Sequence, residues 1–163
     1  MDHLFSPWRF DYVTRRDEGE GCTLCRVAAE PPERDEAVFI LDRATHNFVV
    51  LNIYPYTSGH LMIVPFDHVA RLEDLPAEPR NEMLSLAARA ESVLSELYRP
   101  DGINLGLNLG RCAGAGIVEH LHLHVVPRWC GDTSFMTVTG GARLMPEELS
   151  ESWRKLRGRF GTG

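Results

Sequence analysis

The feature that most constrains this chain is an alternating run, His120-Leu121-His122-Leu123-His124, which continues into Val125-Val126. Side chains alternate between the two faces of an extended strand, so three imidazoles project to one side, each about 7 Å from the next. The leucines and Val125 project to the other side, where they can be buried. A strand with one histidine face and one apolar face is suited to present nucleophiles, acid/base groups or metal ligands.

Five short apolar runs predict the strands of a sheet. They are rich in valine, isoleucine, leucine and phenylalanine and occupy residues 37–42, 48–53, 60–64, 103–109 and 119–126. The first two runs are separated only by the short segment 44–47, which predicts a hairpin.

One long amphipathic segment, residues 76–98, predicts a helix. Its apolar residues recur at three- and four-residue steps and are Met83, Ala87, Ala90, Leu94 and Leu97. A short second helix is expected over 146–159, with Trp153 and Leu156 on one side, and residues 1–36 are expected to be irregular. Strands, one main helix and further strands in this order indicate an α+β domain with an antiparallel sheet.

Composition and charge exclude several classes of protein. The 163 residues are 44% hydrophobic and 25% charged, which suits one compact soluble domain. No apolar run approaches the ~20 residues needed to cross a bilayer, and residues 1–7 lack the pattern of a signal peptide, so a cytoplasmic protein without a membrane partner is expected. A net charge of −6 argues against nucleic acid as a partner. Lys155 is the only lysine, so a basic contact to phosphate is expected to come from arginine.

Four cysteines occur, at positions 22, 25, 112 and 130, and the first two form a CxxC pair. In a cytosolic chain such a pair favours a metal or redox role over a disulfide. With His68 and one histidine of the triplet, Cys22 and Cys25 would complete a Cys₂His₂ zinc set. Redox chemistry and incidental thiols remain alternatives.

Two segments beside the histidine run suit an anionic ligand. Before it lies the glycine-rich loop 110–116, whose backbone N–H groups can approach an anion and to which Arg111 adds charge. After it come Arg128 and Trp129, a guanidinium that favours phosphate and an indole that can stack on a base.

Residues 120–126 match the His-φ-His-φ-His-φ-φ signature of the histidine-triad (HIT) family of nucleotide hydrolases and transferases, where φ is an apolar residue. The resemblance extends to residues 51–52, 59–65 and Asn108 and covers about 22–128. It implies a five-stranded antiparallel sheet with a helix, one domain over 1–163, and a homodimer or higher homo-oligomer.

The HIT family is similar to the hexose-1-phosphate uridylyltransferases, in which the first histidine of the signature ligates zinc. That likeness implies a structural zinc ion held by Cys22, Cys25, His68 and His120. It implies no cofactor for the chemistry itself.

Within the family, residues 102–111, 127–129 and 131–136 look like the bacterial diadenosine tetraphosphate phosphorylases. Hydrolases of the family commonly carry Gly-Gln-Ser/Thr-Val before the signature, whereas this chain has Ala-Gly-Ile-Val at 115–118. The difference favours a phosphorylase that takes a dinucleoside polyphosphate or a mononucleotide together with inorganic phosphate. The alternative is a hydrolase of dinucleoside polyphosphates or nucleoside phosphoramidates that releases AMP.

The resemblance also implies roles for single residues. His122 would attack the α-phosphorus and form a nucleotidyl-histidine intermediate, while His124 would donate to a phosphate or leaving-group oxygen with support from His60. Asn52 resembles the position that holds ribose, and Asn108 one that hydrogen-bonds phosphate. The other expected substrate contacts are Arg111, Gly114, Gly116, Ile117, Arg128 and Trp129.

Two other classes of protein fit closely spaced histidines. In metallohydrolases such histidines hold a catalytic metal that activates water, but a carboxylate ligand is usually close, whereas Glu119 is expected on the opposite face and Asp132 lies several residues beyond the strand. The second class is a nucleotide-binding protein with little catalysis, against which the intact His122 argues.

Overall fold

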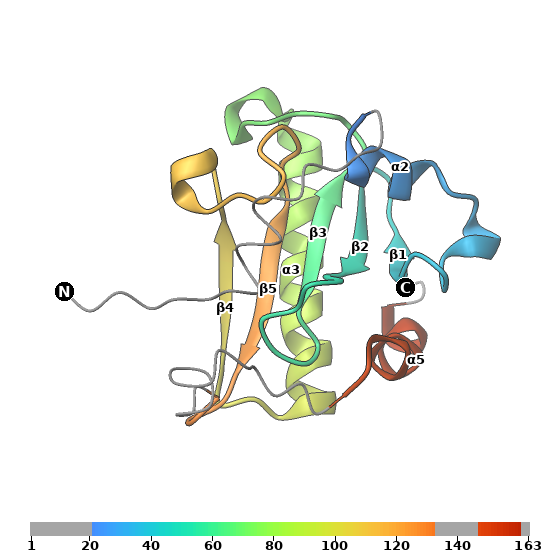
Figure 1. Cartoon of the computed structure of the whole chain (residues 1–163), viewed down its shortest axis with the longest axis vertical. Coiled ribbons are helices and arrows are strands. Elements are labelled where there is room, and N and C mark those ends of the chain that lie inside the picture. The colour runs from blue at the N-terminus through green and yellow to red at the C-terminus, as the bar shows by residue number, and fades with distance from the viewer. Residues whose placement is uncertain (1–20, 133–146, 161–163) are drawn as a thin grey trace.

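A five-stranded antiparallel sheet is the centre of the fold (Figure 1). The computed structural model describes residues 21–132 and 147–160. The strands are β1 (Ile40–Arg43), β2 (Asn47–Leu51), β3 (Leu61–Pro65), β4 (Gly102–Leu107) and β5 (Leu123–Arg128). Their order across the sheet is β1-β2-β3-β5-β4, so β4 forms one edge and β1 the other. The predicted α+β class, the hairpin and the antiparallel sheet are confirmed.

Helix α3 (Ala77–Tyr98) covers one face of the sheet, behind the strands in Figure 1. Met83, Ala87, Ala90 and Leu94 are buried, as their spacing predicts. The helix ends where Arg99 adopts a left-handed conformation with φ 46°.

Helix α5 (Leu149–Phe160) lies beside β1 (Figure 1). Its buried residues include Trp153 and Leu156, which confirms the predicted apolar side. The indole N–H of Trp153 donates to the carbonyl of Ile40 at 2.9 Å, so α5 fastens to the first strand. Pro146, where the helix was expected to start, lies outside the described residues. No helix within the described ranges is long and apolar enough to cross a membrane.

The expectation that residues up to 36 are irregular is wrong for the short helix α2 (Thr23–Ala29), while residues 1–20 lie outside the described part of the chain. No side chain caps the start of α2, and its seven residues are too few to show a repeating apolar face. The helix is fixed instead by tertiary contacts, because Leu24 is buried and Arg43 donates to the carbonyls of Ala28 and Glu30 at its end. Short 3₁₀ turns occupy η1 (Pro32–Arg34), η2 (Leu72–Asp74) and η3 (Arg111–Ala113).

Each face of the sheet carries its own apolar cluster. The larger cluster lies between the sheet and α3 and includes Leu121, Leu123 and Val125. The smaller cluster includes Leu24 of α2 and several strand residues, Ile40, Phe48, Val50 and Val64. The apolar side of the histidine run is therefore buried where the alternation predicts.

The strand itself begins later than predicted, at Leu123 instead of residue 119. His120 and His122 precede it, in a segment that is held by a hydrogen bond from the Leu121 N–H to the carbonyl of Val69 at 2.7 Å. The first two histidines are therefore placed by the loop after β3, and only His124 is placed by the ladder of the sheet.

Candidate active site and metal cluster

The sheet register brings His60 and His124 together. Met62 lies opposite His124 in the β3–β5 pair, so His60, two residues earlier, is a diagonal neighbour of His124 on the same face. The Nε2 of His60 lies 3.0 Å from the Nδ1 of His124. Both imidazoles are buried, with exposed fractions of 1% and 8%.

A backbone donor determines which nitrogens of this pair carry protons. The N–H of Tyr56 lies 3.0 Å from the Nδ1 of His60, and because an amide N–H can only donate, this nitrogen must accept. Neutral His60 therefore carries its proton on Nε2 and donates it to the Nδ1 of His124. His124, in turn, carries its proton on Nε2, where it can donate to a ligand.

His122 is held in the opposite tautomer. Its Nδ1–H donates to the carbonyl of His120 at 2.8 Å, which leaves the lone pair on Nε2. Burial lowers the pKa of His122, and the bond to the His120 carbonyl opposes part of that shift. The rings of His122 and His124 are 4.8 Å apart between centroids. A neutral imidazole nucleophile and an imidazole proton donor thus stand side by side.

His120 belongs to a different cluster from the other two histidines of the run. Its Nε2–H donates to the carbonyl of Pro65 at 2.9 Å, so its Nδ1 carries the lone pair. That nitrogen lies 3.3 Å from the Sγ of Cys22 and 3.4 Å from the Sγ of Cys25. His68 completes the group, with its Nδ1 3.2 Å from the Sγ of Cys25 and 3.3 Å from the Nδ1 of His120.

The geometry of this cluster fits a tetrahedral zinc ion. All four ligand atoms lie within 4.8 Å of one another. Zinc bonds of about 2.0 Å to nitrogen and 2.3 Å to sulfur place the corners of a tetrahedron about 3.3–3.8 Å apart, close to the four separations of 3.2–3.4 Å given above. Without a cation, burial and the neighbouring Cys22 raise the pKa of the Cys25 thiol, whereas a zinc ion would hold it as thiolate.

No second group of three or more potential metal ligands occurs among the described residues, so His122 and His124 do not join one.

The predicted substrate contacts fall into two regions. Asn52, Asn108, Arg111, Gly114 and Gly116 lie on the loops after β2 and β4. The side chain of Asn52 accepts the Tyr54 N–H at 2.9 Å and lies 3.5 Å from the Nδ1 of His60, so it borders the imidazole pair. η3 falls within the predicted glycine-rich loop, with Gly110 and Gly114 at φ 86° and 87°.

Three other predicted contacts remain. Ile117 follows Gly116 on the loop after β4, and it packs against the smaller apolar cluster. Arg128 lies four residues beyond His124, ~13 Å along the strand, and its guanidinium is bonded to Asp132 at 2.6 and 3.0 Å and to Asn104 at 2.9 Å. Trp129 follows at the same end. Neither residue is brought to the nucleophile, so their substrate contacts stay predictions.

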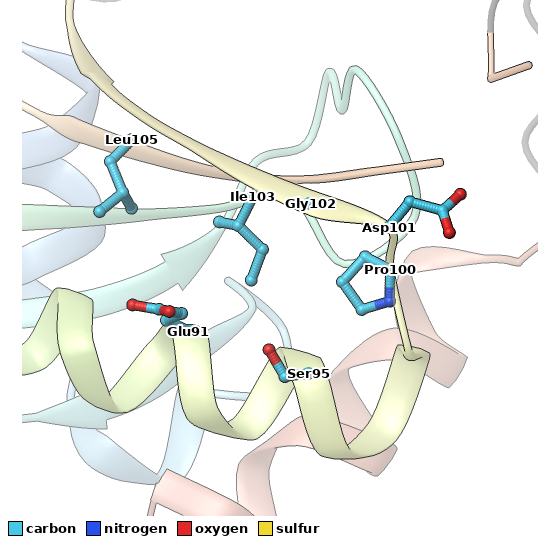
Figure 2. Close-up of a pocket in the computed structure, with 7 residues that line it drawn as sticks. All are labelled: Glu91, Ser95, Pro100, Asp101, Gly102, Ile103 and Leu105. Atoms are coloured by element: carbon cyan, nitrogen blue, oxygen red, sulfur yellow. The ribbon is translucent and has the colours of Figure 1, made fainter. Parts of the chain in front are cut away.

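A pocket lies on the opposite face of the sheet from the imidazoles. Figure 2 shows Ile103 and Leu105 of β4 above Glu91 and Ser95 of α3. Gly106, which alternates with these two strand residues, is the one that lies opposite His124. The pocket therefore belongs to the outer edge of the sheet and not to the histidine chemistry.

Sequence reasoning missed three groups that set the tautomers, the N–H of Tyr56 and the carbonyls of Pro65 and His120. The main-chain contacts leave no mark in the sequence. In the sequence, the aromatic residue Tyr56 four positions before His60 is a signal that could have drawn attention to this loop.

Comparisons with known proteins find relatives over most of the chain. The HIT domain model matches residues 32–130. AP-4-A phosphorylase of Mycobacterium tuberculosis is 38% identical over 161 residues, 96% of this chain and 83% of that protein. Bis(5'-adenosyl)-triphosphatase of Dictyostelium discoideum is 35% identical over 82 residues, 50% of this chain and 54% of that protein. A zinc-bound histidine triad family protein from Mycobacterium smegmatis superposes with a TM-score of 0.68 at 31% identity, covering 86% of this chain and 93% of its own.

Proposed function

This chain belongs to the HIT domain family, and from that premise we propose that it is a nucleotidyltransferase that cleaves diadenosine tetraphosphate with inorganic phosphate. The products are ADP and ATP. The membership and the 38% identity to an AP-4-A phosphorylase make it an enzyme that acts on nucleotides. The phosphorylase reaction is the finer step that we propose.

The observation that carries the proposal is the pair of opposite tautomers at His122 and His124. The Nε2 lone pair of His122 attacks the α-phosphorus of one adenylate, and the bond from that phosphorus to the bridging oxygen breaks. The Nε2–H of His124 donates a hydrogen bond to the departing oxygen and stabilises the charge that develops there, so ATP leaves as an anion and His124 keeps its proton. The adenylate remains bound to His122 through a phosphorus–nitrogen bond.

The second half of the reaction releases the nucleotide. An oxygen of inorganic phosphate attacks the adenylate phosphorus, and the phosphorus–nitrogen bond breaks to give ADP. The electron pair of that bond returns to the Nε2 of His122, the proton of the incoming phosphate leaves with ADP or passes to solvent, and the site returns to its starting state. His60 keeps its own proton throughout and holds the ring of His124 through the 3.0 Å hydrogen bond.

We propose phosphate instead of water as acceptor because of the segment before His120. Gly116 and Ile117 stand where hydrolases of the family carry glutamine and serine or threonine, and Ile117 packs into an apolar cluster. The site therefore lacks two polar side chains that hydrolases place beside the phosphates, and the apolar Ile117 makes it less favourable for a loosely held water molecule. Arg111 and the backbone N–H groups of residues 114–116 remain as anion contacts, while Asn52 and Asn108 are proposed for ribose and phosphate.

The test is to supply diadenosine tetraphosphate with and without inorganic phosphate and to identify the products. ADP and ATP, formed at a rate that saturates in phosphate, support the proposal. The double substitution Gly116→Gln and Ile117→Ser should shift the product towards AMP. AMP and ATP from the parent at an equal rate without phosphate would establish the hydrolase, the reaction class named for the Dictyostelium relative.

We also propose that Cys22, Cys25, His68 and His120 hold one structural zinc ion. The match of their separations to a zinc tetrahedron supports this, as does the similarity to the zinc-bound mycobacterial protein. When bound, the ion would tie α2 to the loop after β3 and to the start of the histidine run. It takes no part in the nucleotidyl transfer.

A homodimer is the proposed assembly, with the enzyme working in the cytoplasm. At the β1 edge of the sheet, the indole N–H of Trp153 donates to a strand carbonyl. Strand β4 forms the opposite edge, and its Leu105 is 49% exposed. A second copy pairing along β4 would cover this leucine and the pocket of Figure 2. Light scattering of the parent and of Leu105→Glu tests the assembly, because the charge should shift a dimer towards monomer.

A further inference from the structure

The loop that joins β2 to β3 is fixed at three points. At its start, the Tyr54 N–H donates to the side-chain oxygen of Asn52 at 2.9 Å. Further along, the Thr57 hydroxyl donates to the carbonyl of Pro127 at 2.7 Å, which ties the loop to β5. At its end, Gly59 has φ 77°, and a Cβ there would lie 3.2 Å from side-chain atoms of α3. Residues 52–59, which we name the strap, thus have a defined backbone path beside the imidazole pair.

The strap carries Tyr56 onto the His60–His124 hydrogen bond. The tyrosine ring lies 4.7 Å from the His60 ring between centroids, tilted by 31°. It lies 6.0 Å from the His124 ring with a tilt of 34°. Both separations fall in the range of favourable aromatic packing. Tyr56 therefore contacts His60 twice, through its backbone N–H and through its ring, and it also reaches His124.

We propose that Tyr56 is a positioning residue for the proton donor: its ring packs over the His60–His124 pair, keeps water from the hydrogen bond between them and holds the plane of His124. The inference rests on the proposed function, because it concerns the step in which the Nε2–H of His124 donates a hydrogen bond to the departing oxygen. Water that reached the Nδ1 of His124 would replace His60 as donor and permit the other tautomer. In that tautomer Nε2 has no N–H to donate to the departing oxygen.

The ring and the backbone N–H make separable contributions. Any substitution at position 56 other than proline keeps the N–H that binds His60. Tyr56→Phe also keeps the ring, whereas Tyr56→Leu keeps apolar bulk without an aromatic face. Tyr54→Leu is the matched control, since it removes a tyrosine from the same strap at a site that is 49% exposed.

Two measurements test the role of Tyr56. In steady-state kinetics, Tyr56→Phe should keep kcat within about threefold, and Tyr56→Leu should lower kcat by about 10–100-fold with KM within about threefold, less than the full contribution of a proton donor. Tyr54→Leu should match the parent. In NMR spectra, the parent should show a slowly exchanging imidazole proton on His60 and a His124 protonated at Nε2. Tyr56→Leu should speed that exchange at least tenfold.

Several results would overturn the inference. A Tyr56→Leu variant with the parental kcat and parental proton exchange would show that the ring has no positioning role. A rise in KM alone would make the ring a substrate contact instead. Because the NMR measurement needs no turnover, it also separates this inference from the proposed function: a protected, correctly protonated imidazole pair in a protein without phosphorylase activity would leave the role of Tyr56 standing.

Discussion

Removing Arg43 should destabilise the protein strongly, because its guanidinium is the central contact of the N-terminal segment. It lies 2.8 Å from the carboxylate of Asp35 and donates to the carbonyls of Ala28 and Glu30 at 2.9 and 2.7 Å. The side chains of Arg43 and Asp35 are 20% and 9% exposed. Arg43→Met keeps most of the apolar stem, removes all these bonds and leaves the carboxylate buried without its main partner.

The geometry sets the size of the effect. Two unit charges at 2.8 Å attract by roughly 6 kcal/mol at an effective dielectric constant of about 20. Part of that energy only offsets the desolvation of both ions, and removing one partner of a buried pair typically costs about 3–5 kcal/mol. Arg157 remains 3.9 Å from Asp35 and moderates the loss. We therefore expect Arg43→Met to lower the free energy of unfolding by about 3 kcal/mol.

Urea unfolding, followed by circular dichroism, measures this loss. Arg34→Met is the matched control, since Arg34 pairs with Glu30 at 3.3 Å on the surface, with side chains 59% and 36% exposed. It should change the free energy of unfolding by less than about 0.5 kcal/mol. Adding Asp35→Asn to Arg43→Met should recover at least ~1 kcal/mol, because the unpaired buried charge is gone. An Arg43→Met loss no larger than that of the control would refute the reasoning.

Three further predictions concern the imidazoles. His124→Ala should lower turnover by ~10²–10⁴-fold in steady-state assays, as expected for a positioned proton donor; parental turnover would contradict the role. His60→Leu should lower kcat more than His60→Gln, whose amide N–H can replace the donor to His124, and equal rates would argue against tautomer control. Because burial lowers the pKa of His122, its neutral form persists below pH 6.5, so adduct formation in rapid-quench assays should hold its plateau as the pH falls through 6.5. Below pH 6.5 the unfolded chain binds a proton on His122 that the folded protein does not bind. The free energy of unfolding therefore decreases as the pH falls through 6.5.

The sequence predicted what local periodicity encodes. The alternation at 120–126 separated the buried leucines from the histidines, and the three- and four-residue steps of Met83, Ala87, Ala90 and Leu94 gave the face of α3. The sheet and its hairpin followed from the apolar runs. These features depend on neighbours within a few residues, which any single sequence displays.

What the sequence could not give is contact between distant residues and the direction of protons. His60 and His124 are 64 residues apart, and Cys22 and His120 are 98 apart, so no spacing rule reports that they meet. Helix α2 was missed because tertiary contacts stabilise it. The tautomers depend on the backbone groups of Tyr56, Pro65 and His120, which carry no side-chain signature.

The last prediction concerns His120 and His122, which lie two residues apart in the histidine run and have different roles. The side chain of His120 faces the cysteines, but its backbone carbonyl holds the Nδ1–H of His122 at 2.8 Å. His120→Gln therefore removes a zinc ligand and keeps the acceptor that fixes the nucleophile. We expect this variant to lose zinc by metal analysis and to unfold at a lower temperature, while the protein that remains folded still forms the nucleotidyl adduct. Cys22→Ser should behave in the same way.

His122→Asn should give the reverse result, with zinc content and unfolding temperature of the parent and no adduct after incubation with labelled dinucleotide. The asparagine amide can still donate to the His120 carbonyl, so the local backbone keeps its contact, but the attacking nitrogen is gone. If His120→Gln kept one zinc ion per chain, the cluster would not be the metal site. If His120→Gln instead kept its fold and lost both zinc and adduct, the ion would be needed to position the nucleophile. Loss of zinc alone in His120→Gln, together with loss of the adduct alone in His122→Asn, would assign the metal to His120 and the chemistry to His122.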